Sequence, residues 1–110
     1  MRYKKEISLS LQVKRFLFFV LLMNIKHDEA GKRFITEVDG YTAHVEYQLT
    51  GDNGFDILHT IVPKEIGGRG VASALVKAAY DYARGKGLTL LATCPYAAVW
   101  LQRHPEYLTE

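Results

Sequence analysis

The stretch VPKEIGGRGVASALVKAAYDYARGKG, residues 62–87, decides the fold. It joins a β-branched run to a helical pattern through three glycines and an arginine, Gly67-Gly68-Arg69-Gly70. After the turn, apolar residues recur at the spacing of one helical face: Val71, Leu75, Ala78, Ala79 and Tyr82. Gly85 and Gly87 then supply the residue type that commonly ends a helix. The stretch therefore predicts a helix that begins directly after a glycine-rich turn.

Strand patterns flank this unit. RFITEV (33–38) and YTAHVEYQL (41–49) are separated by Asp39-Gly40, two residues that tolerate the positive φ angles of a tight hairpin. FDILHTIV (55–62) follows the turn sequence GDNG and stops at Pro63. LTLLAT (88–93) has almost no alternation, which predicts a strand covered on both faces. It is expected to run parallel to residues 55–62, because strand–helix–strand units cross over right-handed.

A second helix is predicted from Pro95 through Trp100 to about Arg103, since proline suits the first turn of a helix. The expected fold class is α+β. A mixed sheet would combine an antiparallel meander with a βαβ unit, and the last helix would close the domain.

The composition indicates a folded globular protein. Of 110 residues, 48% are hydrophobic and 24% are charged. Five of the 14 basic residues but only one of the 12 acidic residues precede Met23, so the remainder carries a net charge of −2. A mildly acidic remainder argues against a nucleic-acid surface. The single cysteine cannot form an internal disulfide, which favours a reducing compartment, hence the cytoplasm.

Residues 1–22, MRYKKEISLSLQVKRFLFFVLL, differ from the rest. Their apolar run, residues 16–22, is far shorter than the ~20 residues needed for a stable membrane span, and no small-residue cleavage site follows it. Three interpretations stay open: an upstream extension with Met23 as the functional start, which we favour, an extra strand or helix packed on the domain, or a weak membrane-surface anchor. Residues 23–110 are expected to form one domain.

A glycine-rich turn at a helix N-terminus suits an anion, because glycines let unpaired backbone amides approach a phosphate. The turn is not a P-loop, since the required lysine is missing. It nearly matches a dinucleotide fingerprint, but Ser73 replaces the last glycine and the next strand ends in Thr93-Cys94 rather than an acid. The spacing alone leaves two interpretations: a phosphate site, or a plain loop ahead of a helix.

The segments HTIVPKEIGGRGVASALVKAAYDYARGKGL and CPYAAVWLQRHPEY resemble the small, single-domain branch of the GNAT-type N-acetyltransferases, as does MNIKHDEAGKRF. The resemblance covers residues 23–107. It implies an acyl-CoA N-acyltransferase-like fold and acetyl transfer from acetyl-CoA to a primary amine, either a small molecule or a protein. In that family a turn of the form Q/R-x-x-G-x-G/A binds the pyrophosphate.

Here Gly67-Gly68-Arg69-Gly70-Val71-Ala72 aligns with that turn. Gly70 and Ala72 match, whereas Gly67 stands where Gln or Arg is usual, which removes one side-chain contact but keeps the backbone amides. The resemblance further implies that the strands 55–62 and 88–93 splay apart at their carboxyl ends. Pantetheine would then pair with backbone near Ile61 and Val62, beyond the ends of parallel strands.

Cys94 precedes Pro95 at the predicted helix start, where the helix dipole stabilises a thiolate. It could accept the acetyl group or protonate the departing coenzyme A thiolate, or it could be a small buried hydrophobe. Tyr96 could act as an acid, line the pocket or pack in the core. Plain alternation places His59 on the face with Phe55, Ile57 and Ile61, as a core histidine or as a general base for the amine.

The leading hypothesis is therefore an acetyl-CoA-dependent N-acetyltransferase assisted by Cys94. A non-catalytic coenzyme A-binding or acyl-carrying module is the alternative, because little of the chain could build the acceptor-shaping helices of larger relatives. A thiol redox sensor is disfavoured, since no resolving cysteine exists. The histidine spacing predicts no metal site.

Overall fold

The structure is a computed structural model that describes residues 23–108. The strands are β1 (Lys26–Asp28), β2 (Arg33–Val38), β3 (Tyr41–Thr50), β4 (Gly54–Ile61) and β5 (Thr89–Ala92). The helices are α3 (Val71–Gly85) and α4 (Pro95–Arg103), with 3-10 turns η1 (Lys64–Ile66) and η2 (Pro105–Leu108). The three interpretations of residues 1–22 concern a segment outside the described residues.

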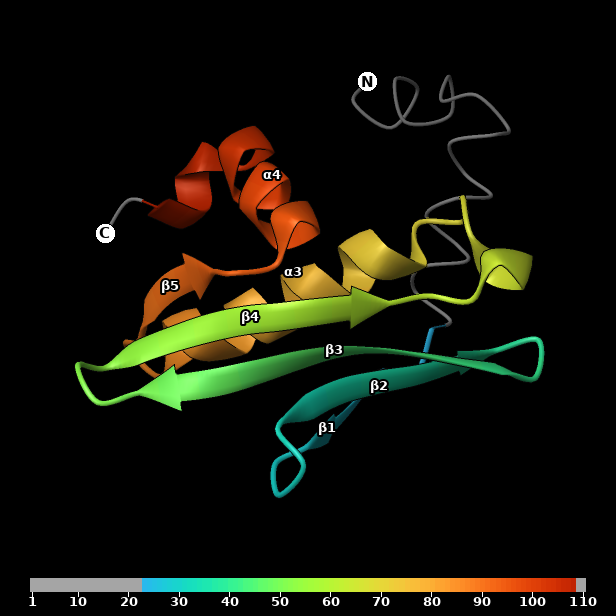
Figure 1. The fold of residues 1–110 in the computed structure, drawn as a ribbon, viewed down its shortest axis with the longest axis horizontal. Coiled ribbons are helices and arrows are strands. Elements are labelled where there is room, and N and C mark those ends of the chain that lie inside the picture. Colours follow the sequence, from blue (N-terminus) through green and yellow to red (C-terminus); the bar gives the residue numbers. More distant parts are fainter. Residues whose placement is uncertain (1–22, 109–110) are drawn as a thin grey trace, which may run out of the picture.

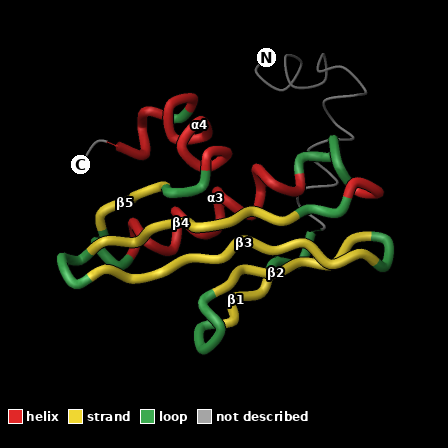
Figure 2. Tube along the Cα trace, viewed as in Figure 1, coloured by secondary structure: helices red, strands yellow, loops and turns green. Residues whose placement is uncertain are grey.

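The strands form one mixed sheet in the order β1-β2-β3-β4-β5 (Figures 1 and 2). The first four are antiparallel neighbours, and β5 pairs parallel to β4 after the crossover through α3. The α+β class and the parallel β4–β5 pair are thus confirmed. The three-residue strand β1 was not predicted, because KHD is too short and too charged to read as a strand.

The β2–β3 hairpin follows its turn chemistry. Asp39 and Gly40 both take positive φ, 51° and 83°, as a tight two-residue turn requires. The register then pairs Val38 with Tyr41 and places Phe34 opposite Val45.

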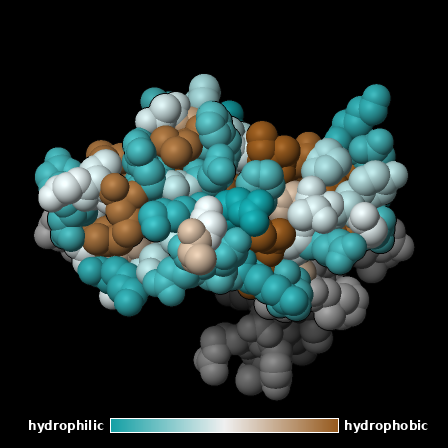
Figure 3. Space-filling view, turned by 60° about the horizontal axis from the view of Figure 1, so that its bottom comes forward, coloured by the Kyte–Doolittle hydropathy of each residue, from teal (hydrophilic) through white to brown (hydrophobic). Residues whose placement is uncertain are grey.

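One helix, α3, packs behind the sheet and buries the core (Figure 1). The largest side chains below 2% exposure come from β3, β4, η1 and α3, and the five largest are Tyr80, Phe55, Ile57, Ile66 and Leu75. In the described chain no helix covers the opposite face of the sheet (Figure 2). Hydrophobic side chains on the side seen in Figure 3 form separate patches among polar ones.

The face of the sheet that no helix covers, called the open face below, explains one wrong prediction. The run 88–93 was expected to be covered on both faces, but only residues 89–92 form a strand, and Thr89 and Leu91 are exposed. As the last strand of the described sheet, β5 has helical cover on one face only. None of the helices in residues 23–108 is long and apolar enough to cross a bilayer.

A β-bulge in β4 corrects the predicted facing of His59. Ile57 lies opposite Tyr47, and His59 lies opposite Glu46, so two steps along β4 match one step along β3 and Leu58 is the extra residue. Since Tyr47 is buried and Glu46 is its neighbour in β3, His59 falls on the open face rather than with Phe55 and Ile57. The same shift brings Thr60, not His59, to the helix-covered face.

Candidate functional site

The glycine turn adopts a conformation that only glycine accepts readily. Gly68 and Gly70 have φ angles of 75° and 80°, in the left-handed region. Gly67, by contrast, has φ −69° and ψ 156°, which any residue adopts, and its amide donates to Lys64 O at 3.1 Å. The backbone thus turns sharply between η1 and α3 without a side chain projecting into the bend at its two strained positions.

The N-terminus of α3 carries unpaired amides. Its N-cap is Gly70, so there is no side-chain cap, and the first helical amide that donates to the backbone is that of Ala74, to Gly70 O at 3.0 Å. The amides of Val71, Ala72 and Ser73 come before it and are left to solvent or to a ligand. Together with the helix dipole, they provide a concentrated partial positive charge for an anion.

A cavity of about 310 Å³ opens at this turn. Its walls come from the residue after β4, from η1, from the glycine turn and from the first turns of α3 and α4. The lining residues are Val62, Ile66, Gly67, Gly68, Gly70, Val71, Ala72, Ser73 and Tyr96. Of the predicted site, the fold therefore brings Val62, the turn and Tyr96 to one cavity. Ile66 and Ser73 were not predicted, although both flank the motif in sequence.

Ser73 also ties the two helices together. Its Oγ accepts a hydrogen bond from Trp100 Nε1 at 3.0 Å, and the indole stacks on His104, with ring centroids 3.9 Å apart. The imidazole of His104 is hydrogen-bonded to Trp100 O at 2.8 Å. This contact fixes α4, and with it Tyr96, against the start of α3.

Two predicted binding residues do not line the cavity. Ile61 is 50% exposed at the end of β4. Arg69 lies within the turn, but its guanidinium forms an ion pair with Asp39 of the β2–β3 hairpin, and the two side chains are 43% and 63% exposed. An exposed pair of this kind contributes little to stability, so an incoming anion can compete for the guanidinium.

Cys94 is 5% exposed and is not among the residues that line the cavity. It is the N-cap of α4; its amide donates to Ile57 O at 2.9 Å, and its Sγ lies 3.5 Å from Thr60 Oγ1. Thr60 is two residues before Val62, and Cys94 is two residues before Tyr96. The thiol thus lies at the carboxyl ends of the parallel strands, and the chain on either side of this contact leads within two residues to Val62 and Tyr96, which line the cavity.

His59 does not join this group. It is exposed and lies opposite Glu46 on the open face, whereas Cys94 and the glycine turn lie on the helix-covered side. Its assignment as a general base remains a prediction that the placement does not favour. Thr60 takes the position that faces the Cys94 thiol. No sequence pattern predicts the bulge that places it there.

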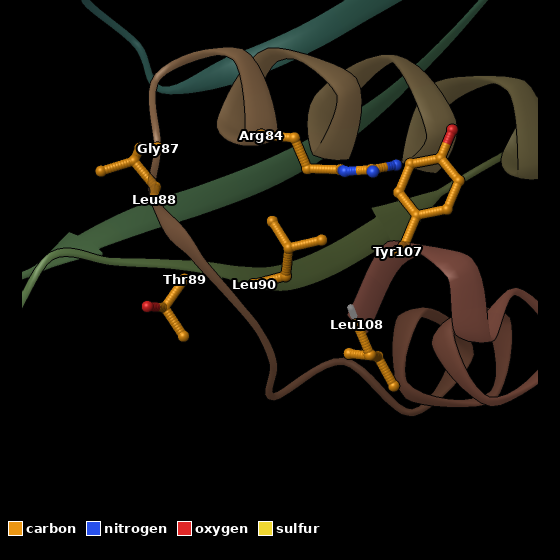
Figure 4. Close-up of a pocket in the computed structure, with 7 residues that line it drawn as sticks. All are labelled: Arg84, Gly87, Leu88, Thr89, Leu90, Tyr107 and Leu108. Carbon is orange, nitrogen blue, oxygen red and sulfur yellow. The ribbon is translucent and has the colours of Figure 1, made fainter. Parts of the chain in front are cut away.

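A larger cavity lies elsewhere in the described chain. It measures about 430 Å³ and is enclosed by the C-terminal end of α3, the start of β5 and η2 (Figure 4). The guanidinium of Arg84 lies over the ring of Tyr107, with 4.6 Å from Cζ to the ring centroid. This cavity is at the amino end of β5, opposite to the end where parallel strands receive ligands, so the smaller cavity is the better candidate.

Comparison with known proteins places this arrangement in a family. A family model described as GCN5-related N-acetyl-transferase matches residues 33–110. Protein NATD1 of Xenopus tropicalis is 31% identical over 85 residues, covering 76% of this chain and 78% of that protein. Protein NATD1 of Homo sapiens is likewise 31% identical over 85 residues, covering 76% and 75%. The solution structure of a GCN5-like protein from Staphylococcus aureus aligns with a TM-score of 0.62 and 32% identity, covering 76% and 82%.

Proposed function

The chain belongs to the GCN5-related N-acetyltransferase family, and we propose that it transfers the acetyl group of acetyl-CoA to a primary amine with the help of Cys94. One observation carries the proposal. The uncapped N-terminus of α3 and Tyr96 of α4 line one cavity, and the buried thiol of Cys94 is the N-cap of α4, two residues before Tyr96.

The glycine turn would hold the donor. The amides of Val71, Ala72 and Ser73 face a cavity with no side-chain cap in the way, and two linked phosphates match such a group of donors. Gly67 replaces the Gln or Arg usual in the family, so backbone amides would supply most of the contacts. Pantetheine would enter beside Val62, toward Thr60 and Cys94.

Cys94 could act in two ways at this point. In the covalent route its thiolate attacks the thioester carbonyl, the carbon–sulfur bond breaks and coenzyme A leaves as a thiolate, which takes up the proton that Cys94 gave up. The amine then attacks the acetyl-cysteine, the bond between the acetyl carbon and Sγ breaks, and the Cys94 thiolate takes the proton that the amine loses. In the direct route the amine attacks the thioester itself. The Cys94 thiol then protonates the departing coenzyme A thiolate, and the resulting Cys94 thiolate takes the proton lost by the amine.

A coenzyme A-binding module without transferase activity is the second candidate, and one observation favours it. In the described chain β1 and β2 are joined by residues 29–32 alone, so no helix stands between them to shape an acceptor pocket. Such a module would bind coenzyme A without releasing it in the presence of amines.

Three measurements test the proposal. Coenzyme A at 100 times its Kd is expected to stabilise the fold by about 2.7 kcal/mol, so a thermal shift comes first. Release of free coenzyme A is then measured with an amine panel, for the wild type, Cys94→Ala and the near-isosteric Cys94→Ser. Intact mass after incubation with acetyl-CoA alone distinguishes the two routes, because only the covalent route adds an acetyl group to the wild type.

The outcomes separate the candidates. Absence of any thermal shift contradicts both the transferase and the module. A shift without coenzyme A release favours the module. If Cys94→Ala releases coenzyme A as fast as the wild type, the thiol has no part in the chemistry.

A further inference from the structure

A buried carboxylate lies where β4 and β5 part. Asp56 is 7% exposed and accepts three hydrogen bonds. Its Oδ1 accepts from the Thr93 amide at 2.8 Å; its Oδ2 accepts from Thr93 Oγ1 at 2.7 Å and from Gln48 Nε2 at 3.1 Å. Two of the three donors thus belong to one residue, the one directly before Cys94.

These bonds fasten the last point at which the two strands meet. The parallel register ends at Ile57 and Ala92. Immediately beyond it, the amides of Thr93 and Cys94 both donate to Ile57 O, at 3.0 Å and 2.9 Å. Past this point β4 continues from Leu58 to Ile61 without a partner in β5, and the next residue, Val62, lines the cavity.

Joining two strands through a buried carboxylate costs free energy. Burial of an ionised group costs several kcal/mol unless charged or hydrogen-bonding partners compensate for it. None of the ion pairs among residues 23–108 includes Asp56, so its hydrogen bonds compensate for the cost of burying the carboxylate. What the carboxylate adds is geometry, because its two oxygens hold both the amide and the hydroxyl of Thr93 and so fix the backbone that carries Cys94.

Asp56 also affects the pKa of a neighbouring tyrosine. Tyr80, which donates to Leu91 O at 2.7 Å, has a raised pKa, mainly because burial disfavours the phenolate and further because Asp56 and Cys94 lie near it. Asp56, Tyr80 and Cys94 therefore surround the end of β5 from three elements: β4, α3 and the start of α4.

We propose that Asp56 is a positioning residue that acts through Thr93: its carboxylate holds the β5–α4 junction and thereby sets the place of the Cys94 thiol against Thr60. Its importance for acetyl transfer rests on the proposed function. The placement of the thiol does not, and can be measured without any acetyl donor.

Cys94 is the only cysteine of the chain, so alkylation of the native protein by iodoacetamide reports on this one thiol. Thr93→Val removes the hydroxyl donor, whereas Thr93→Ser keeps it. Asp56→Asn keeps an acceptor for the Thr93 amide but not the charge. The control is Thr36→Val, because Thr36 likewise donates through its hydroxyl, to Asn24 O at 2.9 Å, but lies buried in β2 at the far side of the sheet from Thr93.

Thr93→Val and Asp56→Asn are expected to raise the alkylation rate constant about tenfold or more under native conditions, since hydrogen bonds to a charged group hold this junction closed. Thr93→Ser should stay close to the wild type. Thr36→Val should lower global stability in urea with little change in alkylation. A purely structural role predicts instead that all variants follow their global unfolding free energies, and that result would overturn the proposal.

Acetyl transfer provides an independent reading. If the wild type turns over acetyl-CoA, Thr93→Val and Asp56→Asn should lower kcat more than they change KM for the donor, and unchanged kcat with unchanged alkylation contradicts the proposal. If even the wild type shows no turnover, the proposed function fails, and the alkylation pattern alone decides whether Asp56 positions the thiol. Should Asp56→Asn fail to fold, the pair Thr93→Val and Thr93→Ser still decides.

Discussion

The adjacent glycines Gly67 and Gly68 offer a sharp test of the turn. Gly68 has φ +75°, whereas Gly67 has φ −69°, and a Cβ added at Gly67 would meet Lys64 O at 3.4 Å, which is ordinary contact. A Cβ at Gly68 would meet nothing within 4 Å. Any cost of Gly68→Ala must therefore come from the backbone rather than from a clash.

The magnitude follows from the two φ angles. Alanine in the left-handed region costs roughly 1–2 kcal/mol. Replacing glycine also restricts the unfolded chain, which favours folding by about 0.4–1 kcal/mol at both positions and cancels in a comparison. Gly68→Ala should thus be about 1–2 kcal/mol less stable than Gly67→Ala, which corresponds to roughly 4–16 °C in Tm for a domain of this size.

Urea unfolding and calorimetry of both variants measure this difference, and titration with coenzyme A measures its consequence for binding. Gly68→Ala should also bind coenzyme A more weakly, because the strained turn can relax and redirect the amides of α3. Equal stability of the two variants, or a less stable Gly67→Ala, would show that the turn does not have this conformation.

Three further outcomes are expected. Asp39→Asn should release Arg69 from its ion pair, tighten coenzyme A binding a few-fold and steepen its salt dependence in titrations at several salt concentrations. Gly67→Gln, which restores a residue usual in the family at an unstrained position, should also tighten binding, whereas Gly67→Ala should not. Folding stability should fall as the pH rises above 10, because the pKa of Tyr80 is raised in the folded state and its contribution is complete only below the unfolded value. Tyr80→Phe should flatten that decline in urea titrations and cost about 1 kcal/mol at neutral pH, since its hydrogen bond to Leu91 O is lost.

Local chemistry predicted most of the elements. Asp39-Gly40 indicated the hairpin, the glycines indicated the start of α3 at Val71, and Pro95 indicated the start of α4, because each is a conformational preference of one or two residues. The order of strand, helix and strand was enough to predict the parallel β4–β5 pair. The turn was predicted to be an anion site for the same reason, since helix geometry alone leaves its amides unpaired, and that assignment stays a prediction.

The arrangement around the thiol could not be predicted in this way. The bulge at Leu58 is a property of two paired strands. It places His59 on the open face and brings the hydroxyl of Thr60 into contact with the thiol of Cys94. Asp56 reads as an ordinary polar residue in a strand until β5 brings Thr93 to its carboxylate, 37 residues away.

The sequence by itself determined most of the elements and the glycine turn, because these depend on residue preferences and hydrophobic periods within short windows, and its resemblance to GNAT-type N-acetyltransferases indicated the family. Only the tertiary structure decided that Arg69 pairs with Asp39, that Tyr96 shares a cavity with the turn, and that a buried carboxylate fastens the junction before Cys94. Such contacts depend on register and on burial, and neither is fixed until distant segments pack together.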